Sequence, residues 1–336
     1  MTVLARLRGW STSVPLLSAC AAAKLRAMAP DDEVDDRYAP TPAVLGDDGP
    51  PAPPSAPAAA TGPFAYPERW GVPGLGAVIP TALRLWKRTL GPTINLGLIA
   101  AIGTAFPTIL DRFAATDPSL EEGPAWALSL LIQVLVGLPL TVICGAAANF
   151  AAADELAFGR QRHGLGALLR HGARFFWTYL GANIMIGLPI VLLVAPGAVA
   201  WAAGVKAVAV ALFALLGVLA LLLLARWAVF GQAIFFEGSG AWSSRDRSRA
   251  LVDGAVWPVL GLYLLQLVVV VTVEEGAPAL AALFGPIPSA LVALAAQVFA
   301  LGFGAVWTFA LYAALRDREL ARERSEGRAS PAPTPP

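Results

Sequence analysis

The fold class is decided by residues 207–257, which read AVAVALFALLGVLALLLLARWAVFGQAIFFEGSGAWSSRDRSRALVDGAVW. The stretch begins with a charge-free run at 207–225, close to the roughly 20 apolar residues that a helix needs to cross a bilayer. A polar connection at 234–257 follows, and a second charge-free run covers 254–273. Two apolar runs around a polar connection predict two membrane-spanning helices whose connection emerges on one side of the membrane. The connection could be a catalytic site, a binding surface or only the place where the chain reaches water.

The composition extends this prediction to the whole chain. Hydrophobic residues make up 57% of the sequence and charged residues only 14%, whereas soluble domains carry about 25% charged residues. A net charge of +1 gives no basic excess, so no nucleic-acid partner is expected. The two cysteines, Cys20 and Cys144, are too few for a disulfide framework. The richness of the chain in Ala, Gly, Pro and Arg suggests a GC-rich bacterial genome.

Charge-free runs predict six membrane-spanning helices, at 89–110, 123–153, 175–205, 207–225, 254–273 and 289–315. The expected fold is therefore an all-α membrane protein whose six transmembrane helices form three hairpins. Residues 74–315 would form this six-span domain. Residues 1–73 are expected to be a disordered, Pro/Ala/Asp-rich tail, and residues 316–336 a charged and then Pro-rich tail. Translation is expected to begin at Met28; an alternative is a lipoprotein cleavage box ending at Cys20.

The positions of lysine and arginine predict the orientation, because cytoplasmic loops of membrane proteins are enriched in these residues. Nearly all of them lie before the first span, in alternate loops, and after the sixth span. The opposite side carries only Arg112 and Lys206, together with acidic residues such as Glu121, Glu122 and Glu274. We therefore expect a multi-pass protein of the bacterial cytoplasmic (inner) membrane with both termini in the cytoplasm.

A repeated segment precedes the first two hairpins. Residues 74–98 (GLGAVIPTALRLWKRTLGPTINLGL) align without gaps to residues 164–188 (GLGALLRHGARFFWTYLGANIMIGL). Apolar residues recur at helical spacing in both copies, which predicts an amphipathic helix lying in the membrane interface before each hairpin. The first such helix is expected to begin at Pro80. The connection at 234–257 is a third, degraded copy, so three units of this kind are predicted.

The segment ARWAVFGQAIFFEGSGAWSSRDRSRALVDGAVWPVLG, residues 225–261, resembles the signature of the glycerophosphoryl diester phosphodiesterase membrane domain family, which are bacterial six-span proteins. The matching positions are Arg226, Glu237, Gly238, Ser248, Arg249, Leu251 and Gly254. The likeness covers roughly residues 74–315 and departs from the pattern at Ser244 and Arg245. It implies the six-span fold. In that family the catalytic barrel is a separate soluble domain, and this chain has no segment of that size, so the resemblance implies no catalytic activity.

Candidate chemical groups are sparse. His163 and His171, with Asp154 and Glu155 upstream, could be metal ligands, but their spacing does not match the i, i+4 pattern of helical metal sites. Adjacent carboxylates at Glu274 and Glu275, and at Glu121 and Glu122, are expected to point apart on a helix, at an outer boundary where the sequence suggests no general base. We therefore expect no catalytic residues, no metal, no cofactor and no enzyme activity.

Amide side chains are the main polar groups within the expected spans, namely Asn95, Gln133, Asn149, Asn183, Gln266 and Gln297. Such groups more often bond between helices than bind a substrate. Phe235, Phe236 and Trp242 are expected at the membrane interface. The residues expected to contact lipid headgroups, including anionic ones, are Arg84, Lys87, Arg88, Arg170, Arg174, Arg245, Arg247 and Arg249.

These features favour a non-catalytic scaffold or accessory module that contacts membrane lipids. The alternative is a small transporter or channel, and a third possibility is a membrane-embedded enzyme of lipid metabolism. A polar cavity within the spans would favour transport, whereas a closed apolar bundle would favour the scaffold.

Overall fold

The computed structural model describes residues 64–114 and 124–326. The sites expected at Cys20, Met28, Glu121 and Glu122 lie outside the described residues. The described part belongs to one compact unit, Ala59–Pro336. Its regular elements are all helical, and the all-α membrane fold is confirmed.

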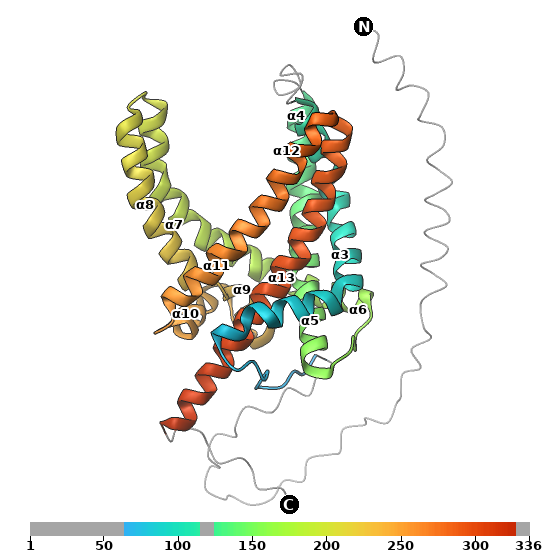
Figure 1. The fold of residues 1–336 in the computed structure, drawn as a ribbon, viewed down its shortest axis with the longest axis vertical. Helices are drawn as coiled ribbons and strands as arrows, with labels where there is room; N and C mark the ends of the chain where they lie inside the picture. The colour runs from blue at the N-terminus through green and yellow to red at the C-terminus, as the bar shows by residue number, and fades with distance from the viewer. Residues whose placement is uncertain (1–63, 115–123, 327–336) are drawn as a thin grey trace, which may run out of the picture. The chain divides into compact units, whose positions relative to one another are not determined.

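Six of the described helical stretches are long and apolar enough to cross a membrane, as predicted. Figure 1 shows how they are arranged. The first is α3 (Val78–Ala114), and the second joins α4 (Pro124–Ile132), the π-helical turn η3 (Gln133–Gly137) and α5 (Leu138–Phe158). The third and fourth are α7 (Phe176–Ala202) and α8 (Lys206–Arg226). The fifth is α11 (Val256–Val271), continued by the π-helical turn η4 (Thr272–Gly276), α12 (Ala277–Ala281) and η5 (Ala282–Phe284); the sixth is α13 (Pro286–Ser325).

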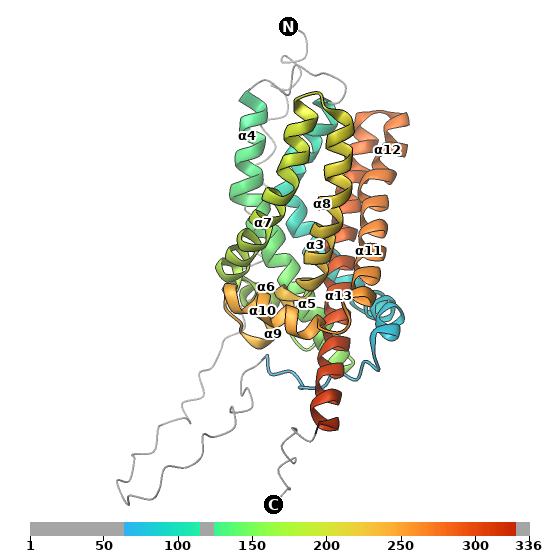
Figure 2. The ribbon, with the colours of Figure 1, turned by 90° about the vertical axis from the view of Figure 1, so that its left-hand side faces the viewer.

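Short helices connect the spans at one end of the bundle. They are α6 (Leu165–Arg174), α9 (Phe230–Glu237) and α10 (Ala241–Val252). α9 and α10 contact each other, whereas α6 packs against α5, beside which Figure 1 shows it. In the view of Figure 2 these short helices lie below α7 and α8. α6 buries Leu168 and Gly172 while Arg170 and Arg174 stay exposed, as its amphipathic pattern predicts. α7 and α8 pack against each other and α8 also contacts α11.

The first amphipathic segment is the beginning of α3, which follows a short 3-10 turn, η1 (Leu75–Ala77). It buries Val78, Ala82 and Leu85. In Figure 1 this part runs across the other helices before α3 turns to run along them. Pro92 lies inside α3, and an interior proline is a common cause of such a bend. The predicted start at Pro80 was two residues late, because a proline is tolerated in the first turn of a helix, where its missing N–H has no partner to lose.

The predicted boundary of the disordered tail at residue 73 was also too late. Residues 64–73 are not helical for the most part, but Trp70 and Val72 are only 7% and 3% exposed. Their backbone N–H groups donate to Asp317 Oδ1 and Oδ2 of α13, both at 2.7 Å. We call residues 64–72 the strap. The aromatic residues within it supply apolar surface that the Pro- and Asp-rich composition around it concealed.

The interior is built around α13. Its segment from Phe303 to Leu315 is largely buried, and it packs against α3, α5, α11 and the strap. A second group of buried residues centres on Phe150 of α5 and Ile234 of α9. In contrast, α7 and α8 expose apolar side chains such as Val191 and Leu215. In a bilayer such surfaces contact lipid at no hydrophobic cost.

Candidate functional site: an amide-lined pocket within the helices

A pocket of about 540 Å³ lies among α5, α7, α9, α11 and α13. Amide, hydroxyl and phenol groups from all five helices face it. We call it the amide pocket. Its polar lining consists of Thr141, Asn149, Tyr179, Asn183, Gln232, Tyr263, Gln266 and Thr308. The lining includes no Asp, Glu, Lys or Arg, so the amide pocket offers hydrogen bonds without formal charge.

One side of the amide pocket is fixed by a buried hydrogen-bond network. Gln232 is 5% exposed, and its Nε2 donates to Asn149 Oδ1 at 3.0 Å and to Thr308 Oγ1 at 2.8 Å. Asn149 Nδ2 in turn donates to the Gly145 carbonyl at 2.9 Å. The network joins α5, α9 and α13, as expected for amides between membrane helices. It holds these side chains in fixed positions at the pocket wall.

Gln266 of α11 differs from this network. Its Oε1 atom is buried and accepts no hydrogen bond from any described residue. A buried acceptor without a partner costs roughly 1–3 kcal/mol, and such groups in native structures call for an explanation. Because Gln266 lines the amide pocket, a hydrogen-bond donor occupying the pocket would satisfy it.

Two further polar cavities adjoin the amide pocket. One of about 420 Å³ shares Thr141, Gln266, Leu301 and Gly304 with it. Another, of about 310 Å³, shares Thr104, Gln133 and Gln297 with the second. The amide of Gln297 accepts from Thr104 Oγ1 at 2.8 Å and donates to Thr108 Oγ1 at 2.9 Å. Polar groups therefore succeed one another along the spans, from Asn149 to Thr108.

Both π-helical turns border this series of cavities. η3 contains Gln133 and η4 contains Glu274, and both residues line the second cavity. A π-turn inserts an extra residue into a helix and re-aims the side chains around it, and such turns occur frequently at functional sites. Two of them at one series of cavities mark it as the best candidate site among the described residues. Glu274 is the carboxylate of this series of cavities, and it lines the second one.

The amides expected from the sequence thus divide into three groups. Asn149 and Gln297 bond between side chains of different helices, as predicted. Asn183 bonds to the Tyr179 carbonyl of its own helix, while Asn95 is exposed on α3. The third group, Gln133 and Gln266, lines cavities, as Asn149, Asn183 and Gln297 also do, and the buried amide oxygen of Gln266 has no donor among the described residues. Sequence reasoning missed Gln232, although a lone amide within the apolar run WAVFGQAIFF was a usable signal.

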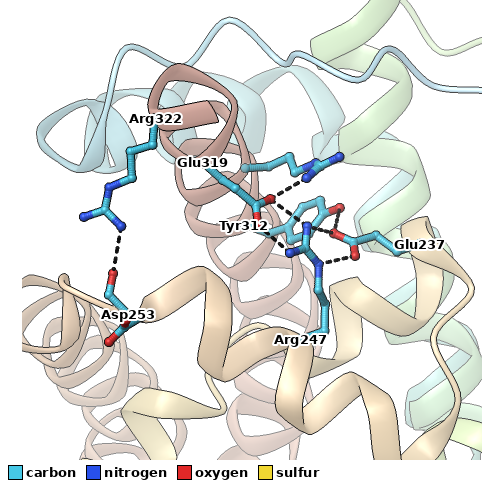
Figure 3. A network of polar contacts seen from close by, with 7 residues as sticks. Glu237, Arg247, Asp253, Tyr312, Glu319 and Arg322 are labelled. Atoms are coloured by element: carbon cyan, nitrogen blue, oxygen red, sulfur yellow. Dashed lines mark hydrogen bonds and ion pairs between the residues drawn. The ribbon is translucent and has the colours of Figure 1, made fainter. Parts of the chain in front are cut away.

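The connection at 234–257 holds an ion-pair network, drawn in Figure 3. Arg247 of α10 donates from Nη2 to Glu319 Oε2 at 2.7 Å and to Glu237 Oε1 at 3.2 Å. Glu237 also accepts from the Tyr312 hydroxyl at 3.0 Å, and Arg316 pairs with Glu319. Hydrogen bonds to Glu319 and Glu237 raise the pKa of Arg247 further, although burial opposes this. Arg247 is therefore held by two glutamates, although its side chain stays 24% exposed, and its contact with lipid headgroups stays a prediction.

The other predicted headgroup residues have different surroundings. Arg245 lies over the ring of Trp242, 4.5 Å from its centroid, and Arg88 pairs with Glu155 at 3.1 Å. Exposed positions are occupied by Arg84, Lys87, Arg88, Arg170, Arg174 and Arg249. Contact of these residues with headgroups stays a prediction. Phe235 and Phe236 were wrongly expected at the interface, because both pack among aromatic rings of α5 and its neighbours.

The two histidines belong to the packing of the strap. Phe64 stacks on both rings, with centroid distances of 4.1 Å to His163 and 3.7 Å to His171. Asp154 is fully buried and accepts from Tyr66 Oη at 3.1 Å and from the His163 backbone N at 2.9 Å. Burial, followed by Arg174 and His163, lowers the pKa of His171 to about 4, which keeps it neutral at physiological pH. Among the described residues no three His, Cys, Asp or Glu side chains group as a metal site.

No family model, no curated protein and no solved structure matches this chain. The resemblance to the glycerophosphoryl diester phosphodiesterase membrane domain family therefore stays a prediction. The class defined by the fold is a six-span α-helical membrane protein.

Proposed function

We propose that this protein binds a membrane amphiphile with an uncharged, hydrogen-bonding headgroup and helps it move across the bilayer. The headgroup would occupy the amide pocket, and the apolar part would lie along the exposed apolar surfaces of the spans. The observation that carries the proposal is Gln266, whose amide oxygen is buried in the pocket without a donor.

The character of the pocket supports an uncharged ligand. Transferring a charge into the membrane interior costs several kcal/mol, so charged ligands usually meet charged partners there. The amide pocket supplies amides, hydroxyls and phenols instead, a set suited to polyols and sugars. The adjoining cavities continue the amides and hydroxyls along the spans, and the second cavity adds the carboxylate of Glu274. A polar series of this kind favours the transport alternative, while the contact with lipids expected of a scaffold is retained.

We propose further that the protein lies in a bacterial inner membrane with both termini in the cytoplasm. The segments rich in arginine contact each other at one end of the spans. Arg88 pairs with Glu155, Arg247 pairs with Glu319, and Asp317 holds the strap. Their common location supports one cytoplasmic end, in agreement with the distribution of lysine and arginine.

Replacing Gln266 with leucine should slow transport without harming the fold. The substitution removes an unpartnered oxygen, so thermal stability should be retained. One lost hydrogen bond to the headgroup, worth about 1 kcal/mol, should slow transport roughly fivefold. The measurement is the rate at which vesicles containing the protein expose a fluorescent diacylglycerol glucoside to an external quencher.

Asn95→Leu is the matched control, because it removes an exposed amide of α3 that does not line the amide pocket. This variant should transport at the wild-type rate. Wild-type vesicles no faster than protein-free vesicles would contradict the proposal, as would equal rates for Gln266→Leu and the wild type.

A further inference from the structure

A second pocket, of about 520 Å³, lies between the end of α8 and the start of α11. Its lining comprises Leu219, Leu222, Leu223, Arg226, Gly254, Ala255, Val256, Trp257 and Pro258. It shares none of these residues with the amide pocket. We call it the Arg226 pocket.

The charge of this pocket comes from one residue. Arg226 ends α8, is exposed, and its guanidinium has no hydrogen-bond or ion-pair partner among the described residues. No carboxylate lines the pocket. In contrast, Arg88 and Arg247 are paired with glutamates. An arginine without a partner in a pocket free of acids is complementary to an anion, and its planar fork suits a phosphate.

The walls of the Arg226 pocket are apolar and continue along the span. Leu219, Leu222 and Leu223 precede Arg226 by seven, four and three residues in α8, so they lie on the same helical face as the arginine. Trp257 on the opposite wall is 72% exposed, and tryptophan is enriched where membrane meets water. A phosphate beside Arg226 would therefore be followed by apolar surface that fits an acyl chain.

The rim of the pocket is held in place by α13. Gly254 has φ +67°, a conformation that favours glycine, and its carbonyl accepts from Arg318 Nη2 at 2.9 Å. Arg322 donates to the Asp253 carbonyl at 3.4 Å, as Figure 3 shows. These contacts fix the turn that leads into α11, so the rim of the pocket is held in a defined position by hydrogen bonds from α13.

We infer that the Arg226 pocket binds an anionic phospholipid, with the phosphate at Arg226 and one acyl chain along the leucines of α8. The apolar walls assign the site to a lipid and not to free phosphate. This site is separate from the amide pocket in residues and in ligand charge. It would anchor the protein to the anionic leaflet whether or not the proposed transport holds.

The test is native mass spectrometry of the full-length protein with an equimolar mixture of phosphatidylglycerol and phosphatidylcholine carrying the same chains. The wild type should retain more phosphatidylglycerol. Arg226→Gln should lower this preference roughly fivefold, the effect of one basic residue near a headgroup, and Arg226→Lys should keep most of it. Excess inorganic phosphate should not displace the lipid.

Arg160→Gln is the matched control, since Arg160 is an exposed arginine that neither lines the pocket nor belongs to the residues expected to contact headgroups. It should leave the preference unchanged, and thermal unfolding of each variant confirms that it is folded. An equal loss in Arg160→Gln and Arg226→Gln would show a diffuse surface charge and overturn the inference. Absence of any preference in the wild type, or displacement by phosphate, would overturn it as well.

Discussion

Replacing Asp317 with alanine is expected to lower the free energy of unfolding by about 3 kcal/mol and to release the strap. The carboxylate is 8% exposed and accepts the backbone N–H groups of Trp70 and Val72, both at 2.7 Å. Hydrogen bonds to a charged group contribute roughly 1.5–3 kcal/mol each, and the two donors would be left buried without a partner. Asp317→Asn keeps one acceptor oxygen and should lose less.

The release can be followed by trypsin cleavage after Arg69, which is exposed in the strap beside Trp70. Cleavage at this bond, detected by mass, should be many times faster in Asp317→Ala. Glu323→Ala is the control, because Glu323 is an exposed carboxylate of the same helix. If all three proteins are cut at the same rate, the carboxylate does not hold the strap.

Replacing Arg247 with alanine should cost about 2 kcal/mol, whereas Arg249→Ala should change the stability by less than about 0.5 kcal/mol. Removing Arg247 leaves Glu237 and Glu319 facing each other with side chains only 21% and 23% exposed. The penalty is below that of a fully buried pair because water reaches these groups. Arg247→Lys should recover only part of the loss, since an ammonium cannot reproduce the two-sided contact.

Thermal unfolding in detergent at neutral pH, with and without high salt, measures the difference between the two variants. Arg249 serves as an internal comparison of the same residue type on the same helix. Equal melting temperatures for Arg247→Ala and Arg249→Ala would show that the network in Figure 3 does not stabilise the protein.

The six spans were predictable because a bilayer requires each spanning segment to have a minimum length and to lack charged residues, and both properties are visible in the sequence. The roles of Arg247 and Arg249 were harder to separate, since both lie in the same basic cluster. α10 buries Ser244, Ser248, Leu251 and Val252, and Arg247 adjoins this face. A helical projection of 241–252 would have suggested the difference, but not the glutamates that meet Arg247 from α9 and α13.

The amide pocket could not be predicted from the sequence. An amide that bonds to another helix and an amide whose oxygen has no donor among the described residues are identical in one dimension, as Asn149 and Gln266 show. The distinction depends on which side chains the folded helices bring within hydrogen-bond distance. The π-helical turns at Gln133 and Glu274 were equally hidden, because the residues QVLVG and TVEEG also fit an ordinary α-helix and carry no mark of a π-turn.

Photolabelling in membranes tests the central claim most directly. The probe is a diacylglycerol glucoside with a diazirine on its sugar, activated by light in vesicles that contain the full-length protein. We predict that peptide mapping finds the label on lining residues of the amide pocket, such as Gln232 and Gln266, and that excess unlabelled glucoside prevents it. Label confined to the exposed apolar faces of α7 and α8, and unaffected by the competitor, would contradict the proposed binding of a headgroup between the helices.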